Sequence, residues 1–321
     1  MAHLNLCNHW FVKEDVMKKI ALMGAGAVGA YFIQGLCDLM GDDFFLIADG
    51  SRKERLEKNG VNINDMVYKP IVKTPKEARG VDYLLIATKY TALESCLDDI
   101  ETIVTDKTTV LSLLNGVDSE EVIAERIGKE HIIYSFMKIA SMNVDGKIKF
   151  DLNVTKGIYL GEIGTKEISD REKALIDIFE MTNIKYVHCE DIILEMWKKY
   201  ALNICRNLPQ AVVAVGVGAY DDSEHLAYIC EMMREEVHSV AQAKGIPLIV
   251  QDYLPARVKT EDAARYSTLQ DLDAGRHTEI DIFSGRLVEM GKELGIPTPF
   301  NDMCYHLIKT LEEKNDGKFN Y

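Results

Sequence analysis

Three polar side chains recur at intervals of four residues in the second half of the chain. Lys199, Asn203 and Asn207 fall within an apolar-periodic segment, so on a helix they would share one face. Asparagine is a mediocre helix former that prefers caps and turns, so two of them in such a stripe need a reason. A site for an anionic, oxygen-rich ligand would be one. A structural pairing of Lys199 with Glu195, four residues earlier, is the alternative, and these residues alone do not decide between the two.

A second polar segment runs from Tyr266 to Asp281. Gly275 separates two helical stretches, and Thr278 is suited to cap the second of them, which would place Glu279 in its first turn. Glutamate is favoured at that position by the helix dipole alone, without any function.

A glycine pattern near the N-terminus indicates a nucleotide site. The apolar run Ile20–Met23 is followed by GxGxxG and then by a helix-like segment. In a dinucleotide site the first glycine makes a tight turn, the second lets the main chain approach a pyrophosphate, and the third lets helix and strand pack closely. Free N–H groups at the helix start then hold the diphosphate. The residues expected to line this site are Gly24, Ala25, Gly26, Ala27, Val28 and Gly29.

The residues after the second predicted strand bear on which nicotinamide cofactor is used. Asp49 follows Gly29 by about 20 residues, where an acidic side chain binds the adenosine ribose hydroxyls. A carboxylate at that position favours NAD(H) and repels a 2′-phosphate. Arg52, with Lys53 and Arg55, could instead accommodate the 2′-phosphate of NADP(H), or could simply be a solvated helix face.

The elements that must position these residues divide the chain in two. From 18 to 189 short apolar runs alternate with amphipathic segments, which predicts an α/β Rossmann-type domain with a doubly wound parallel sheet. From 190 to 321 a 3.6-residue period dominates and predicts an all-α domain. We expect this domain to carry the substrate and dimer contacts. Residues 1–17 are expected to be an extension. The expected strands are 20–23, 44–48, 83–87, 109–113, 132–139 and 159–160, with a hairpin in 62–72 and edge strands in 146–161. The expected helices are 27–40, 51–59, 90–103, 118–127, 169–182, 190–207, 223–244, 260–272, 278–294 and one near 300–314.

Composition and charge bear on the partners, the cellular compartment and the metal content that we expect of the protein. The 321 residues include 51 acidic and 37 basic side chains, and the formal net charge of −14 argues against nucleic acid or an anionic membrane surface as a partner. Seven scattered cysteines without a CxxC pattern, and no apparent targeting segment, lead us to expect a cytoplasmic protein with reduced thiols. The histidines show no metal-ligand spacing, so no metal is expected.

Five motifs in order resemble the ketopantoate reductase family (2-dehydropantoate 2-reductase). They are GAGAVG, Thr88-Lys89 after a strand, Leu114-Asn-Gly116, WxKxxxNxxxN and SxxxDxxxGRxTEID, and they span residues 18 to about 310. The resemblance implies a Rossmann domain followed by a helical domain, with the active site in the cleft between them. It also implies reduction of 2-dehydropantoate to (R)-pantoate with NADPH, on the route to pantothenate and coenzyme A, and often a homodimer.

The resemblance also assigns roles. Lys199 falls on the family's catalytic lysine and Glu279 on its acidic partner. Asn203, Asn207 and Ser267 fall on positions that contact the 2-oxo acid, and Asn115 and Lys89 on positions near the nicotinamide and the cofactor phosphates. A lysine ammonium can stabilise the charge that develops on the ketone oxygen and deliver its proton. Two residues depart from the family pattern: Asp49 stands where many members have arginine, and Tyr266 precedes Ser267 where serine is frequent.

Two other functions fit parts of the pattern. A paralogue on the same scaffold could reduce another 2-oxo acid or act on a 3-hydroxy acid, and Tyr266 keeps this open. A non-catalytic protein that senses NAD(P) would need the glycine loop but not the lysine, asparagine, serine and glutamate set. Cofactor binding without turnover of any oxo acid would distinguish it.

Overall fold

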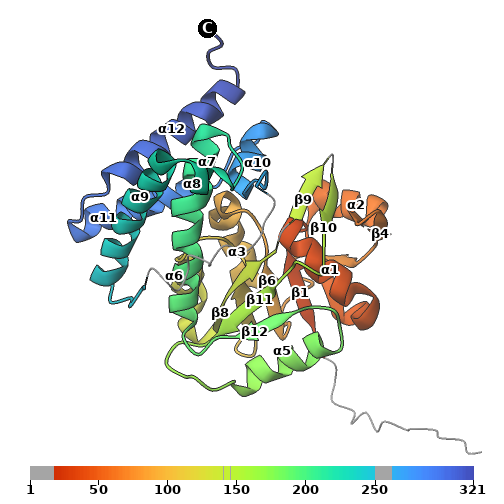
Figure 1. The fold of residues 1–321 in the computed structure, drawn as a ribbon. Coiled ribbons are helices and arrows are strands. Elements are labelled where there is room, and N and C mark those ends of the chain that lie inside the picture. The colour runs from red at the N-terminus through yellow and green to blue at the C-terminus, as the bar shows by residue number, and fades with distance from the viewer. Residues whose placement is uncertain (1–17, 140, 145, 250–261) are drawn as a thin grey trace, which may run out of the picture.

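A computed structural model describes residues 18–139, 141–144, 146–249 and 262–321. The expected extension 1–17 lies outside these residues, as does the start of the helix expected over 260–272. Within the described part, an eight-stranded sheet stands beside a group of helices formed by the second half of the chain (Figure 1). In spatial order its strands are β12 (Tyr186–His188), β11 (Gly157–Gly161), β8 (Ile132–Lys138), β7 (Thr109–Ser112), β6 (Tyr83–Ile86), β1 (Ile20–Met23), β2 (Phe44–Ile47) and β5 (Ile71–Lys73).

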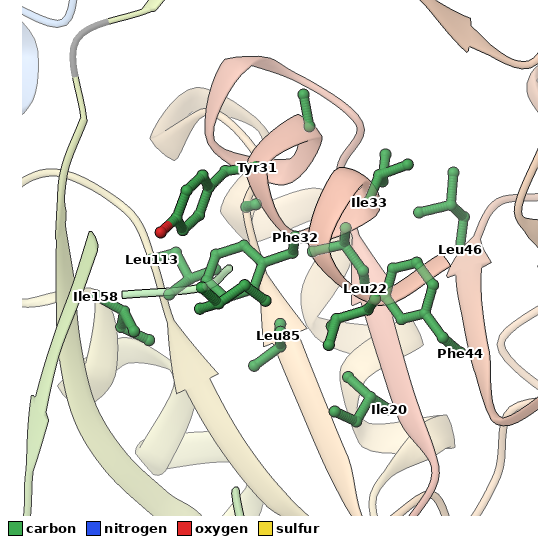
Figure 2. Packing of buried hydrophobic residues seen from close by; sticks show 14 of the residues in the cluster. Ile20, Leu22, Tyr31, Phe32, Ile33, Phe44, Leu46, Leu85, Leu113 and Ile158 are labelled. Carbon is green, nitrogen blue, oxygen red and sulfur yellow. The ribbon is translucent and has the colours of Figure 1, made fainter. Parts of the chain in front are cut away.

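Both faces of the larger sheet are covered, as a doubly wound fold requires. Along β1, Ile20 and Leu22 face one cluster of buried side chains while Ala21 and Met23 face the other, which follows from the two-residue period of a strand. Figure 2 shows the first cluster, where Phe32 of the helix after β1 packs over the sheet. The first half contains α1 (Ala27–Met40), α2 (Gly50–Asn59), α3 (Leu93–Ile103), α4 (Ser119–Ile127) and α5 (Asp170–Glu180), with short 3₁₀ turns at 41–43, 90–92 and 129–131. Side chains of α1 and α5 belong to the first cluster and those of α3 and α4 to the second.

The order of the strands places a topological switch point beside β1. The chain passes from β1 through α1 to β2, and later returns to place β6 on the other side of β1, with both pairings parallel. The carboxyl ends of β1 and β6 therefore meet where the direction of winding reverses, which is the usual ligand position in an open α/β sheet. The predicted α/β Rossmann-type fold is confirmed.

The hairpin expected in 62–72 and the edge strands expected in 146–161 are only partly as predicted. The expected hairpin is present as β3 (Val61–Ile63) and β4 (Met66–Tyr68), but the following β5 leaves it to extend the larger sheet beside β2. The edge-strand prediction for 146–161 was wrong for β10 (Lys147–Phe150), which pairs with β9 (Ser141–Val144) and β3 in a second, four-stranded sheet. Ile148 and Phe150 are buried in the cluster that α1 also covers, and this burial decides their place.

The second half of the described chain is helical. Its elements are α6 (Ile192–Leu202), α7 (Leu208–Val213), α8 (Ala219–Asp222), α9 (Glu224–Ala243), α10 (Ser267–Asp273), α11 (Arg286–Leu294) and α12 (Pro299–Asn315). The side chains of Asp191 and Ser223 cap α6 and α9 by accepting main-chain N–H groups. Gly295, with φ 70°, ends α11, and Pro299 opens α12. No described helix is long and apolar enough to cross a membrane.

Two of the expected helices are interrupted by wide turns. The helix expected over 190–207 is α-helical only to Leu202, and Asn203–Asn207 form a π-helical turn. The helix expected over 278–294 begins with a π-helical turn at Asp281–Gly285. The α10 helix starts at Ser267 rather than at 260. A π turn adds one residue to a single turn, and over so short a stretch the apolar pattern of the sequence does not distinguish it from an α-helix.

Candidate active site

The glycine loop at the end of β1 has the shape that its pattern predicts. Gly24 has a φ of +105°, and a Cβ there would lie 2.4 Å from the carbonyl oxygen of Ala87 at the end of β6. A Cβ on Gly29 would lie 2.0 Å from the carbonyl oxygen of Gly24. Both positions therefore require glycine, the first for its backbone conformation and the second so that α1 can pack onto the loop.

The middle glycine is open. Gly26 is exposed at the N-cap of α1, and a Cβ there would meet no atom within 4 Å. Ala25, Ala27 and Val28 around it are half-buried. The Thr88 hydroxyl at the end of β6 is buried without a hydrogen-bond partner. An open loop, the free N–H groups of a helix start and an unpartnered hydroxyl together fit the diphosphate and ribose of a dinucleotide.

The charged residues after β2 divide into one structural and two exposed groups. Lys53 donates to the carbonyl oxygen of Val72 and forms an ion pair with Glu57 at 3.0 Å, so it holds α2 in place. Asp49 at the N-cap of α2 and Arg52 in its first turn are both exposed. Lys53 therefore has a structural role and does not lie on a solvated face. Arg52 and Arg55 are exposed, as a solvated face requires, and Asp49 and Arg52 are also accessible to a ligand at the carboxyl edge of the sheet.

The predicted lysine and glutamate are joined by an asparagine from the other half of the chain. Lys199 near the end of α6 donates from Nζ to Oδ1 of Asn115 at 2.7 Å, and Asn115 donates from Nδ2 to Oε2 of Glu279 at 2.7 Å. Asn115 follows β7, so the sheet supplies the central group of this relay. Lys199 also lies 5.5 Å from the ring centroid of Phe136 on β8. We call Lys199, Asn115 and Glu279 the polar relay.

Burial changes the acidity of the lysine in this relay. Removal from water lowers the pKa of Lys199 to about 8, from the usual 10.5. The carboxylate of Glu279 opposes that shift, the ammonium of Lys138 on β8 adds to it, and the carboxylate of Glu120 opposes it. Lys199 is thereby suited to hold and release a proton near neutral pH.

The structural alternative for Lys199 was wrong. Glu195 forms its ion pair with Lys198 instead, at 2.7 Å. Because adjacent helical residues differ by about 100°, this pairing leaves Lys199 to point in another direction, toward Asn115.

The π turn changes the predicted stripe of polar residues. Asn203 and Asn207 lie in the turn itself, so the regular spacing of four does not continue through it. Asn207 is buried, donates from Nδ2 to Oγ of Ser267 at 3.1 Å, and accepts the main-chain N–H of Thr268 with Oδ1 at 3.1 Å. The structure therefore brings Asn207 and Ser267 together, while Asn203 is half-buried in the same turn without being joined to them.

Lys89 lies where the two halves of the chain meet. Its ammonium donates to the carbonyl oxygen of His277 at 3.5 Å. A small cavity of about 60 Å³ is lined here by Lys89, Thr91, Glu279 and Ile282 among others. Glu279 thus faces both the polar relay and this cavity.

Two residues that the sequence did not single out support the site. Glu120 on α4 is 1% exposed, accepts the Ser119 hydroxyl at 2.8 Å, and burial raises its pKa to about 8. Asp118 accepts Nε of Arg286 on α11 at 2.7 Å, which ties the loop after β7 to the helical half. Both acids precede or begin a helix, where acidic residues are common, so no sequence signal distinguished them.

The fold and the site define a protein that binds a dinucleotide at a Rossmann-type sheet and holds a half-buried lysine between that sheet and a helical half. The model of the family "Ketopantoate reductase PanE/ApbA" matches residues 20–165, and that of "Ketopantoate reductase PanE/ApbA C terminal" matches 191–312. The chain belongs to the ketopantoate reductase family.

Proteins of known name agree over nearly the whole length. The chain is 28% identical over 309 residues to a 2-dehydropantoate 2-reductase of Pyrococcus horikoshii, covering 93% of this chain and 99% of that protein. The corresponding protein of Streptococcus pyogenes serotype M18 is 27% identical over 306 residues, covering 91% and 97%. A ketopantoate reductase of Ralstonia eutropha JMP134 has a similar structure, with a TM-score of 0.78, 25% identity and coverage of 93% and 99%. The structure of D-mandelate dehydrogenase in its ternary complex with NADH and anilino(oxo)acetate has a similar fold. Its TM-score is also 0.78, at 23% identity and coverage of 93% of this chain and 99% of that one.

Proposed function

We propose that this chain reduces 2-dehydropantoate to (R)-pantoate with a nicotinamide cofactor, in pantothenate and coenzyme A biosynthesis. The observation that carries the proposal is the polar relay, in which a half-buried lysine of lowered pKa is joined through Asn115 to a carboxylate where the two halves meet. The names of the full-length relatives support the choice of substrate.

The residues of the chain divide the work of this reaction. A bound reduced nicotinamide would supply the hydride to the ketone carbon. Lys199 stabilises the negative charge on the ketone oxygen and delivers its proton, while Asn115 and Glu279 fix the direction of the ammonium. Asn203, Asn207 and Ser267 supply neutral hydrogen bonds to the carboxylate and distal hydroxyl of the substrate. The loop Gly24–Gly29 holds the diphosphate, and Lys89 approaches the cofactor phosphates.

The proposal is tested by the rate of NADPH oxidation with 2-dehydropantoate, compared with the rates for other 2-oxo acids. These include phenylglyoxylate, the 2-oxo acid that corresponds to mandelate. We expect 2-dehydropantoate to have the highest kcat/KM. A higher value for another oxo acid would establish the paralogue alternative, which the departure at Tyr266 keeps open. Cofactor binding with no turnover of any oxo acid would instead support a sensor.

The pH dependence should report the lysine. In the reductive direction Lys199 must carry its proton, so kcat should be constant below the pKa of Lys199 and fall as the pH rises through about 8. In the oxidative direction the neutral amine is required, and the rate should rise over the same range. A reductive profile that stays flat to pH 10 would contradict the role of Lys199.

We propose NADP(H) as the preferred cofactor, with NAD(H) as the alternative that Asp49 keeps open. Arg52 at the start of α2 is the group available to a 2′-phosphate. Arg52→Ala should raise the KM for NADPH with little effect on that for NADH, whereas Asp49→Ser should lower the KM for NADPH. Lys58→Ala, in the last turn of the same helix, is the matched control. If Arg52→Ala leaves both KM values unchanged, NAD(H) is the better assignment.

The assembly and location are proposals of the same kind. One protein of similar fold, at 17% identity and a TM-score of 0.72, is described as the dimeric ketopantoate reductase of Staphylococcus aureus. We propose a homodimer that acts in the cytoplasm, and light scattering of the purified chain measures the first part directly.

A further inference from the structure

The residue just before Glu279 is held by the last helix of the chain. Glu312 on α12 is 2% exposed, and its Oε1 accepts both the main-chain N–H and the hydroxyl of Thr278, each at 2.7 Å. The Thr278 hydroxyl oxygen in turn accepts the main-chain N–H of Ile280 at 3.2 Å. The main chain is therefore fixed on both sides of Glu279 through one buried carboxylate.

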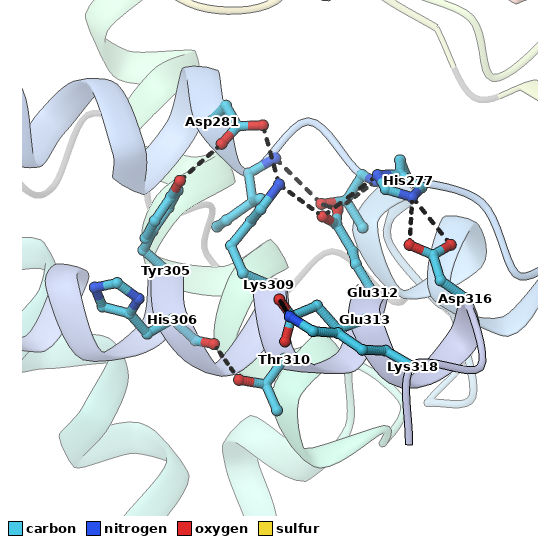
Figure 3. Close-up of polar contacts among 12 residues, drawn as sticks. His277, Asp281, Tyr305, His306, Lys309, Thr310, Glu312, Glu313, Asp316 and Lys318 are labelled. Carbon is cyan, nitrogen blue, oxygen red and sulfur yellow. Dashed lines mark hydrogen bonds and ion pairs between the residues drawn. The ribbon is translucent and has the colours of Figure 1, made fainter. Parts of the chain in front are cut away.

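Charged neighbours keep that carboxylate in place. Lys309, one turn earlier on α12, forms an ion pair with Oε2 of Glu312 at 2.9 Å. His277 lies 3.7 Å from Glu312 and forms a second contact with Asp316 at 3.0 Å. Figure 3 shows this cluster, in which the side chains of Glu312 and Asp316 point at the segment that carries His277, and Lys309 lies between Glu312 and Asp281.

Such anchoring matters because Glu279 is not part of a regular helix. The sequence pattern placed it in the first turn of a helix capped by Thr278, but the helix begins only at Asp281, with a π-helical turn, and becomes α-helical at Arg286. Thr278 bonds to Ile280 as in a capping turn, yet its hydroxyl proton goes to Glu312 rather than to any group of its own segment. The position of the Glu279 carboxylate, 2.7 Å from Asn115, thus depends on a contact with a distant helix.

We propose that Glu312 is a positioning residue of the active site, which holds Glu279 against Asn115 and Lys199 through its two bonds to Thr278. This inference rests on the proposed function for its catalytic consequence, but the geometry it describes can be tested without turnover.

The first test is Glu312→Leu, which removes both acceptors from Thr278. We expect kcat to fall roughly tenfold, with little change in the KM for the cofactor. This loss is smaller than the about 100-fold loss of rate that a 1 Å misplacement can cause. The groups that face Lys199 are Glu279, Lys138 and Glu120, and withdrawal of Glu279 removes one of the two carboxylates that keep the pKa of Lys199 up. The pH at which reduction declines should therefore move below that of the unmodified protein.

Matched variants separate positioning from general destabilisation. Glu313→Leu alters the next residue of the same helix, which pairs only locally with Lys318, and should leave kcat and the pH profile unchanged. Glu312→Gln keeps an oxygen that can accept both bonds and should recover most of the lost rate. Thr278→Val removes only the hydroxyl. Its effect and that of Glu312→Leu should be far from additive in the double variant.

A readout independent of catalysis is the rate at which acetic anhydride modifies Lys199 as a function of pH, followed by peptide mass spectrometry. Glu312→Leu should lower the pH at which Lys199 becomes reactive, and Glu313→Leu should not. If the folded Glu312→Leu protein keeps the kcat, pH profile and Lys199 reactivity of the unmodified chain, the proposal is wrong. If Glu312→Leu fails to fold, unchanged Lys199 reactivity in Thr278→Val overturns it instead. A shift in reactivity in a protein that does not reduce 2-dehydropantoate would leave the positioning role intact and reject only the proposed substrate.

Discussion

Lys199→Met should lower kcat for 2-dehydropantoate reduction by about 10²- to 10⁴-fold, the usual contribution of a positioned proton donor. Methionine preserves much of the length and apolar stem of lysine but has no proton to give. The cofactor loop lies on the sheet side of the site, so the dissociation constant of NADPH should change little. Stopped-flow turnover and fluorescence titration of bound NADPH measure the two quantities separately.

The neighbouring lysine provides the control. Lys198 lies on the same helix and pairs with Glu195 at 2.7 Å, away from the polar relay. Lys198→Met should therefore keep kcat near that of the unmodified protein. Equal losses in both variants would mean that the helix, rather than the Lys199 ammonium, had been disturbed, and a Lys199→Met protein of normal kcat would remove the proposed mechanism.

Alanine at the second glycine of the loop should weaken cofactor binding, whereas alanine at the third should destabilise the protein. Gly29→Ala places a Cβ 2.0 Å from the carbonyl oxygen of Gly24, so α1 must move, at a cost of about 1–3 kcal/mol in the free energy of unfolding. Gly26→Ala meets no protein atom and has an ordinary φ of −80°, so the protein itself should remain stable. Its methyl group would instead keep the diphosphate from the helix N–H groups, and affinity for the cofactor should fall about 10- to 100-fold.

Urea unfolding without cofactor and titration with cofactor test this pair. The informative result is the combination in Gly26→Ala of unchanged unfolding and weakened binding. If Gly26→Ala binds NADPH and NADH as tightly as the unmodified chain does, the diphosphate does not lie on this loop, and the assignment of residues 24–29 has to be abandoned.

The parts of the structure that could be predicted from the sequence depend on local signals. Strand β1, the glycine turn and α1 follow one another in the chain, and their apolar periods and backbone requirements all lie within residues 20–40. Most strands of the larger sheet could be placed for the same reason, because a buried parallel strand is a short continuous apolar run.

The parts that could not be predicted depend on contacts between distant segments. Asn115 and Lys199 are 84 positions apart, and Thr278 and Glu312 are 34 apart, so no local pattern links them. The role of Asn115 came only from the family resemblance. That of Glu312 had no signal at all, since one glutamate among several on an amphipathic helix shows nothing of its burial. The second sheet was missed because β10 pairs with β3, and four strands of the larger sheet (β5, β6, β7 and β8) lie between these two segments in the chain.

The two π turns at 203–207 and 281–285 pack against each other, and the hydroxyl of Tyr200 donates to the carbonyl oxygen of Phe283 at 2.7 Å. Each turn replaces the α-helical i→i−4 backbone bonds by i→i−5 bonds, a rare arrangement, and the two turns hold each other in place by their packing. Their amide protons should therefore exchange with deuterated solvent through one shared opening event, with similar protection on both segments. The segment that carries Lys199 and the segment that carries Glu279 would then open and close in a single cooperative step.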